Sequence, residues 1–249
     1  MKKSKDNSVK RWFGENLAEI LAEKISPVYK KFDVKKYIKH ISSSCKDLEY
    51  TARINLHADA LKEFLPRDYK KSVEILMKTL GEENKEETGM FTNFYWLMPF
   101  AKFVEKYGLE DFKTSIKAIE EITKRNTGEY AIRPFIKKYP KESLAVLETW
   151  SKSKNFHLRR LSSEGLRPKL PWATKLEIFI KNPKPVFKIL NNLIKDDIKF
   201  VQKSVANNIA DYLKVNKEEG VKFLKKYLKS KNKNTQWIIK HATRKIKIS

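Results

Sequence analysis

A pair of amphipathic segments, SLAVLETW (residues 143–150) and FHLRRLSS (residues 156–163), carries the clearest signal of the fold. Their apolar residues recur three and four positions apart, which is the spacing of one face of an α-helix. A short polar linker, SKSKN, separates the two segments. The sequence therefore predicts two helices that pack against each other and offer a further apolar stripe to a neighbour.

The same arrangement recurs twice toward the C-terminus. The second pair is PVFKILNNL (185–193) with KFVQKSVA (199–206), and the third is GVKFLKKYL (220–228) with TQWIIKHA (235–242). Aligning Leu158, Val201 and Ile238 gives steps of 43 and 37 residues. Helix pairs at about 40-residue spacing are typical of HEAT-like solenoids, in which each pair buries its apolar stripe on its neighbours. We therefore predict an all-α, curved, HEAT-like helical-repeat solenoid with a basic concave surface, with a compact helical bundle as the alternative.

Helical periodicity extends over the rest of the chain. Glycine is scarce, with 7 residues, and no segment alternates as a strand would. The predicted helices include 10–25, 91–107, 128–138, 141–151, 155–165, 172–181, 184–194 and 198–213. We expect residues 1–249 to form a single helical-repeat domain with no appended C-terminal domain.

The net charge of +24 favours polyanionic partners. Lysine outnumbers arginine 45 to 9, so part of the excess reflects a compositional bias toward lysine. Its distribution is nevertheless uneven, because residues 181–249 alone carry a net +13. Five of the nine arginines lie within 43 residues, from Arg125 to Arg167. Arginine offers a planar fork of donors that lysine cannot replace, so this window is the first candidate for a functional site.

Several classes of protein are disfavoured. Cys45 is the only cysteine, which rules out a disulfide within one chain and a multi-cysteine zinc site. The chain contains no apolar run of about 18 residues and no signal peptide pattern. Nucleotide-binding glycine loops and the H-E-x-x-H motif are absent, and the four histidines are scattered. We expect a cytoplasmic, nucleoid-associated monomer without membrane contact, cofactor or metal.

Two stretches in and beside the arginine-rich window carry polar and charged side chains. In TKRNTGEYAIRPF (123–135), Thr127 fits the N-cap of a helix and Glu129 fits its first turn. Helix capping, a purely structural role, would therefore explain both residues. In HLRRLSSEGLRPKLPW (157–172), arginines and Lys169 suit phosphate oxygens. Glu164 fits either an exposed salt bridge with Arg160 or a functional carboxylate, and Trp172 fits a core residue as well as a stacking surface.

A third stretch, SVANNIADYL (204–213), places polar groups on an otherwise apolar helix. Asn207, Asn208 and Asp211 could hydrogen-bond across a repeat interface. In the aligned repeats Glu164 corresponds to Asn207, and Asp211 lies one turn further on. With neighbouring helices about 8–10 Å apart, Glu164 and Asp211 are expected to converge on one substrate.

Together these stretches resemble the AlkC branch of the HEAT-like DNA alkylation-repair glycosylases. The resemblance lies in TGEYAIRPF, in SSEGLRPKLPW and more weakly in SVANNIADYL and WIIKHATRKI. It implies catalytic carboxylates at Glu129, Glu164 and Asp211, with Trp172 near the damaged base. Gly128 departs from the pattern, which has Ser before the first Glu. The residues expected to contact DNA are Arg133, Arg159, Arg160, Arg167, Lys169 and Lys203.

The resemblance also implies an activity. The expected reaction is hydrolysis of the N-glycosidic bond of cationic N-methylated bases such as 3-methyladenine, with 3-methylcytosine and 1-methyladenine as further candidates. The expected partner is double-stranded DNA that contains alkylated bases. The alternative is a non-catalytic HEAT-like scaffold that binds nucleic acid or an acidic protein, for which the charge and the repeats would look the same.

Overall fold

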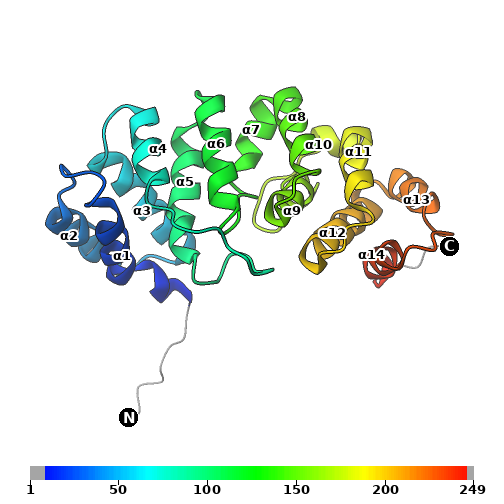
Figure 1. The fold of residues 1–249 in the computed structure, drawn as a ribbon, viewed down its shortest axis with the longest axis horizontal. Helices are drawn as coiled ribbons and strands as arrows, with labels where there is room; N and C mark the ends of the chain where they lie inside the picture. The colour runs from blue at the N-terminus through cyan, green and yellow to red at the C-terminus, as the bar shows by residue number, and fades with distance from the viewer. Residues whose placement is uncertain (1–8, 246–249) are drawn as a thin grey trace, which may run out of the picture. The chain divides into compact units, whose positions relative to one another are not determined.

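The computed structural model describes residues 9–245, which fold as helices joined by loops (Figure 1). The chain divides into two compact units. The first comprises the described residues up to Glu83 together with Met90–Asn126, and the second comprises Asn84–Gly89 and the described residues from Thr127 onward. The ends of the predicted 1–249 domain, residues 1–8 and 246–249, lie outside the described residues, and the single domain and its curvature stay predictions.

The first unit begins with a 3-10 helix, η1, and ends with α6. Its elements are η1 (Val9–Phe13), α1 (Glu15–Ile25), α2 (Val34–Ser44), α3 (Tyr50–Phe64), α4 (Tyr69–Met77), η2 (Tyr95–Leu97), α5 (Met98–Tyr107) and α6 (Phe112–Thr123). Asp33, Asp68 and Asp111 cap α2, α4 and α6 by accepting backbone N–H groups in the first turn.

The second unit contains the repeated helix pairs. Its elements are α7 (Ile132–Lys138), α8 (Pro140–Trp150), α9 (Phe156–Glu164), α10 (Glu177–Lys181), α11 (Lys184–Leu193), α12 (Lys199–Val215), α13 (Lys217–Lys225) and α14 (Lys233–Thr243). The second helices of the pairs, α9, α12 and α14, lie side by side, with α12 in the middle (Figure 1). The predicted all-α class and the repeated helix pairs are confirmed.

The aligned residues of the repeats occupy equivalent places in the core. Leu158 on α9, Val201 on α12 and Ile238 on α14 are all buried. Burying an aliphatic side chain of this size contributes about 1.5–3 kcal/mol, so each pair gains most of its stability from its neighbours. The long helix α12 is held on one side by α9 and on the other by α14, which fixes the direction of its polar side chains.

Close packing at the end of α9 requires a glycine. The side chain of Asn155 caps the helix start by accepting the backbone N–H of His157 at 2.9 Å. At the other end, a Cβ on Gly165 would lie 2.8 Å from Cγ2 of Ile132 on α7. The absence of that Cβ lets the end of α9, which carries Glu164, approach α7.

Two predicted helices begin later than the periodicity indicates. Helix α7 starts at Ile132 rather than 128, and α10 starts at Glu177 rather than 172. Residues 128–131 and 172–176 are apolar enough to extend a helix, but their polar groups bond to distant parts of the second unit, as described below. The predicted helix 10–25 is divided at Gly14 between η1 and α1, and 91–107 is helical only from Tyr95.

Among residues 9–245, no helix has both the length and the apolar character that crossing a membrane would need.

Candidate active site

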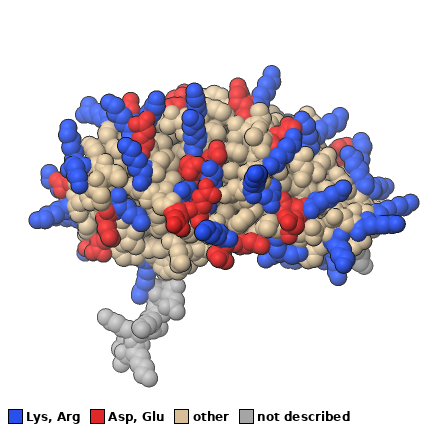
Figure 2. Space-filling view, viewed as in Figure 1, with Lys and Arg blue, Asp and Glu red and all other residues tan. Residues whose placement is uncertain are grey.

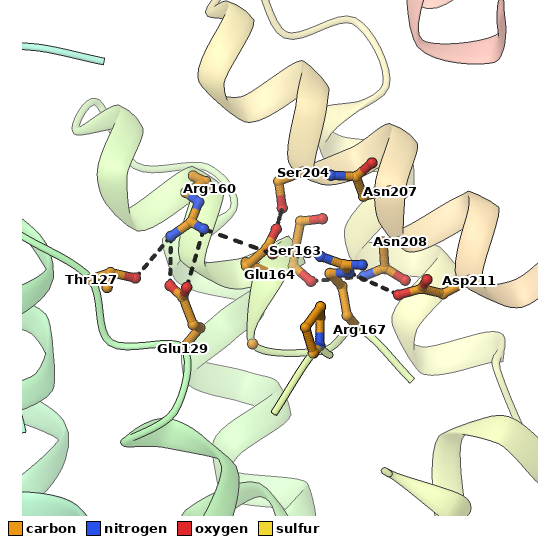
Figure 3. Close-up of polar contacts among 12 residues, drawn as sticks. Thr127, Glu129, Arg160, Ser163, Glu164, Arg167, Ser204, Asn207, Asn208 and Asp211 are labelled. Carbon is orange, nitrogen blue, oxygen red and sulfur yellow. Dashed lines mark hydrogen bonds and ion pairs between the residues drawn. The ribbon is translucent and has the colours of Figure 1, made fainter. Parts of the chain in front are cut away.

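Three carboxylates and two guanidinium groups alternate along one line in the second unit (Figure 3). The order is Glu129, Arg160, Glu164, Arg167 and Asp211, hereafter the ion-pair row. The residues come from the loop before α7, from α9, from the loop after α9 and from α12. All three carboxylates are largely buried, with 5%, 6% and 8% of their surface exposed. The three predicted catalytic carboxylates therefore meet in one place.

Arg160 holds Glu129 at one end of the row. Its Nη1 donates to Glu129 Oε2 at 2.6 Å and to the Thr127 hydroxyl at 2.8 Å. The guanidinium also lies 4.7 Å above the ring of Phe200 at the start of α12. The capping interpretation of this stretch is wrong, because Thr127 accepts from Arg160 instead of capping α7, and Glu129 lies in the preceding loop instead of the first helical turn.

Glu164 occupies the centre of the row at the last residue of α9. Its Oε1 accepts from Arg167 Nη1 at 2.8 Å and lies 3.8 Å from Arg160 Nη2. Its Oε2 accepts from the Ser204 hydroxyl of α12 at 2.6 Å. The salt bridge to Arg160 that spacing predicted is present, yet it is buried and is the longest of these contacts.

Asp211 ends the row on α12. Its Oδ2 accepts from Arg167 Nε at 2.8 Å. Among the described residues, no group donates to its Oδ1. Arg167 therefore bridges Glu164 and Asp211, and one oxygen of Asp211 stays available to a ligand or to water.

Burial and charge act differently on the two carboxylates that Arg167 bridges. Burial alone would raise the pKa of Glu164, but Arg160, Arg167 and the Ser204 hydroxyl outweigh it and hold that pKa below its usual value. Burial raises the pKa of Asp211, since the single bond from Arg167 does not offset the loss of water. Two carboxyls whose pKa values are displaced in opposite directions are suited to different roles, a fixed negative charge and a proton acceptor.

The loop after α9 is held by Arg133 of α7. The Arg133 Nη1 donates to the carbonyl oxygens of Gly165 and Arg167 at 3.0 and 2.9 Å, and its Nη2 donates to that of Thr174. Burial lowers the pKa of Arg133 to about 10, which keeps it charged at neutral pH. These bonds keep residues 172–174 out of a helix and fix the loop that carries Arg167.

Trp172 lies at the tip of this loop in a left-handed conformation, with φ of 58°. The backbone N–H of Ala173 donates to the carbonyl of Leu170 at 3.2 Å, so Pro171 and Trp172 are the central residues of a type II-like turn. Its side chain is 86% exposed. Trp172 is therefore not a core residue, and its ring faces solvent.

The four arginines predicted to contact DNA phosphate all have acceptors within the protein. Arg133 binds backbone carbonyls, Arg160 and Arg167 belong to the ion-pair row, and Arg159 Nε donates to Asp196 Oδ2 at 2.6 Å. All four are mostly buried because their guanidinium groups satisfy carboxylates and loop carbonyls. By contrast, the side chains of Lys169 and Lys203 are exposed.

Some residues of the site were missed by sequence reasoning. Asn208 was not among them, because it was expected to hydrogen-bond across a repeat interface, and its Nδ2 donates to the Ser163 carbonyl of α9 at 2.7 Å. Ser204 was missed, although it lies on the same face of α12 as Asp211 at helical spacing. That spacing was a usable signal. No sequence pattern indicated Phe200, whose ring lies beneath Arg160. Within residues 9–245 no three histidine, cysteine or acidic side chains are grouped as a metal site would require.

Known proteins resemble this chain in sequence and in fold. Residues 50–246 match the model of the family described as DNA alkylation repair enzyme. The uncharacterized protein YhaZ of Bacillus subtilis (strain 168) is 33% identical over 237 residues, which are 95% of this chain and 64% of YhaZ. A solved structure of the Pseudomonas fluorescens alkylpurine DNA glycosylase AlkC, bound to DNA containing an abasic site analog, superposes with a TM-score of 0.85 at 30% identity.

The superposition covers 95% of this chain and 64% of the AlkC chain, so the chain spans somewhat less than two thirds of the length of either relative. The matched residues include the whole ion-pair row, the loop with Trp172 and the helices that hold them. This chain belongs to the DNA alkylation repair enzyme family.

Proposed function

We propose that this chain is a DNA glycosylase that hydrolyses the N-glycosidic bond of alkylated, cationic bases in double-stranded DNA. The observation that carries the proposal is the ion-pair row, in which three carboxylates face only two guanidinium groups. When all are ionised the row has a net charge of −1, although it is embedded in a chain with a net charge of +24. A site that only gripped phosphate would not gain from these buried acids.

The proposed chemistry begins with the leaving base. A methylated base such as 3-methyladenine carries a positive charge, so the bond from C1′ to the base nitrogen breaks with its electron pair going to the base, which leaves neutral. The deoxyribose becomes an oxocarbenium cation. A carboxylate about 4 Å from that charge contributes on the order of 4 kcal/mol at an effective dielectric near 20, so a row with net negative charge lowers this barrier.

Asp211 is the group that we assign to the water. Its raised pKa makes it a better proton acceptor than an ordinary carboxylate, and its Oδ1 receives no hydrogen bond from the described residues. Water attacks C1′, its proton passes to Asp211, and the sugar is left with a hydroxyl group at C1′. Glu164 and Glu129, each held by an arginine, supply fixed negative field.

The exposed residues complete the proposed site. Trp172 would contact the cationic base or the sugar through cation–π attraction. Lys169 and Lys203 would contact the DNA backbone. The AlkC structure holds DNA with an abasic site analog, which resembles the product of this reaction. We propose 3-methyladenine as a substrate, with 3-methylcytosine and 1-methyladenine as further candidates.

The test is base release from methylated DNA, with the products resolved by chromatography. Asp211→Asn and Glu164→Gln should each lower the rate of release by roughly 10² or more, because each removes a charge that acts in the transition state. Both variants should still bind lesion-free duplex DNA.

The matched control is Glu148→Gln, which removes one carboxylate charge at a surface ion pair with Lys188. Its release rate should equal that of the unchanged protein. Release at the full rate by both site variants would show that the ion-pair row has no catalytic role. No release by the unchanged protein from any methylated DNA would rule out the proposed glycosylase activity.

A further inference from the structure

Cationic side chains of α12 and α14 gather around His241, next to the ion-pair row. Lys199 Nζ lies 3.7 Å from the centre of the Trp237 ring, and that ring stacks on the imidazole of His241 at 4.7 Å. Arg244 at the end of α14 reaches back to α12, where its Nη2 lies 3.5 Å from Asn207 Oδ1. Lys203 lies one helical turn from both Lys199 and Asn207. We call Lys199, Lys203, His241 and Arg244 the cation cluster.

The cation cluster differs from the other arginine sites of the second unit. Arg159, Arg160 and Arg167 each bind a carboxylate. Within residues 9–245, Lys199, Lys203 and Arg244 form no ion pair. Over the C-terminal helices, Lys and Arg side chains dominate the face drawn in Figure 2. Like charges held together on two packed helices repel each other, so the cluster is suited to an anion that would relieve the repulsion.

The cation cluster and the ion-pair row each have members on the same helix, α12, so an anion bound by the cluster would lie near the row. Lys203 precedes Ser204, which binds Glu164, and Asn207 lies one turn before Asp211 on the same helix. An α-helix rises 1.5 Å per residue, so Lys203 and Asp211 are about 12 Å apart along α12.

We propose that Lys199, Lys203, Arg244 and His241 bind phosphates of the DNA backbone near the base that is removed. This inference rests on the proposed function for the identity of the anion. The lysines and Arg244 supply charge, while the imidazole of His241 supplies a hydrogen-bond donor once it is protonated. The stacked Trp237 ring holds the imidazole in place.

Protonation of His241 makes the contact sensitive to pH. Burial lowers the pKa of His241, and Arg244, Lys203 and Lys199 lower it further. The two lysines face it from α12 and Arg244 from its own helix α14. A bound phosphate offsets these charges and raises that pKa, so DNA binding takes up a proton. Affinity for DNA should therefore increase as pH falls from about 8 to about 6.

The first experiment compares two double variants that remove equal charge. Lys203→Gln with Arg244→Gln removes two cations of the cluster, and Lys225→Gln with Lys229→Gln removes two exposed cations on α13 and just after it. Binding to a lesion-free duplex is measured by fluorescence anisotropy over a range of KCl concentrations. The slope of log affinity against log salt should become shallower by about 0.9 for each phosphate that the protein no longer neutralises, in the cluster variant alone.

Equal slopes for the two double variants would overturn the proposal. In the second experiment, His241→Gln should abolish the increase in affinity between about pH 8 and pH 6, and an unaltered pH dependence would overturn the role of His241. Neither experiment involves base release. The proposal for the cation cluster can therefore be wrong while the glycosylase proposal stands. If the protein releases no base, the salt slopes still show whether the cluster binds DNA.

Discussion

At the scale of single residues, Trp172 affects stability through its left-handed backbone and the proposed activity through its exposed ring. A left-handed conformation costs a residue with a Cβ roughly 1–2 kcal/mol, and glycine avoids that cost. Trp172 is 86% exposed, so its removal leaves no cavity. We expect Trp172→Gly to raise the free energy of unfolding by up to about 1 kcal/mol. The same change should slow base release by roughly 10-fold, because it removes the proposed cation–π interaction.

Trp172→Ala is the matched control for that prediction, because it removes the ring and keeps the unfavourable φ. Urea unfolding should show a gain in stability for Trp172→Gly only, whereas both variants should release base slowly. Full activity in either variant would mean that the ring has no part in the reaction, and a decrease in the stability of Trp172→Gly would contradict the strain argument.

The sequence predicted which carboxylates belong to the site better than it predicted what surrounds them. Glu129, Glu164 and Asp211 were identified by resemblance, and Glu164 and Asp211 also by the alignment of repeats. The roles of Arg160 and Arg167 could not be read from the sequence, because an arginine that binds phosphate and one that binds a buried carboxylate leave the same local pattern. Only the tertiary structure distinguishes them, because it brings Glu129 to Arg160 and Asp211 to Arg167.

At the scale of elements, Arg133 holds the loop between α9 and α10. Three backbone carbonyls of that loop accept from its guanidinium. Leaving buried acceptors without donors costs about 1–3 kcal/mol each before relaxation. We expect Arg133→Gln to lower the free energy of unfolding by roughly 2–4 kcal/mol, measured by urea unfolding. The slope of log affinity for DNA against log salt should not change. A slope that becomes shallower by about 1 while stability is unchanged would instead mean that Arg133 contacts a DNA phosphate, as the sequence predicted.

The boundaries of α7 and α10 show where periodicity stops being informative. Apolar spacing found α8, α9, α11 and α12 within one or two residues, because those helices are held by burial along one face. Residues 128–131 and 172–176 carry helix-compatible side chains. Their conformation is instead set by Arg160 and Arg133, which lie up to 41 residues away in the sequence. A local pattern cannot contain such contacts.

At the scale of the whole molecule, lowered carboxyl pKa values make stability depend on pH. Asp111 caps α6, and its bond with Thr114 lowers its pKa. The pKa of Glu164 is lowered as well. A carboxyl with a lower pKa in the folded state stabilises the fold above its unfolded pKa and loses that contribution as pH falls through its folded pKa. Asp211, with its raised pKa, acts in the opposite sense and opposes part of this loss.

The free energy of unfolding should therefore decrease as pH falls from about 5 to about 3, measured by urea unfolding with far-UV circular dichroism at each pH. Asp111→Asn isolates one contribution, because asparagine still caps a helix but does not ionise. This variant should be nearly as stable as the unchanged protein at neutral pH and should lose less stability in acid, while Asp197→Asn at an exposed position should follow the unchanged protein. If Asp111→Asn loses as much stability in acid as the unchanged protein, ionisation of the α6 cap is not part of the acid response, and the loss must then arise at other carboxyls whose pKa the fold lowers, such as Asp33, Glu121 and Glu164.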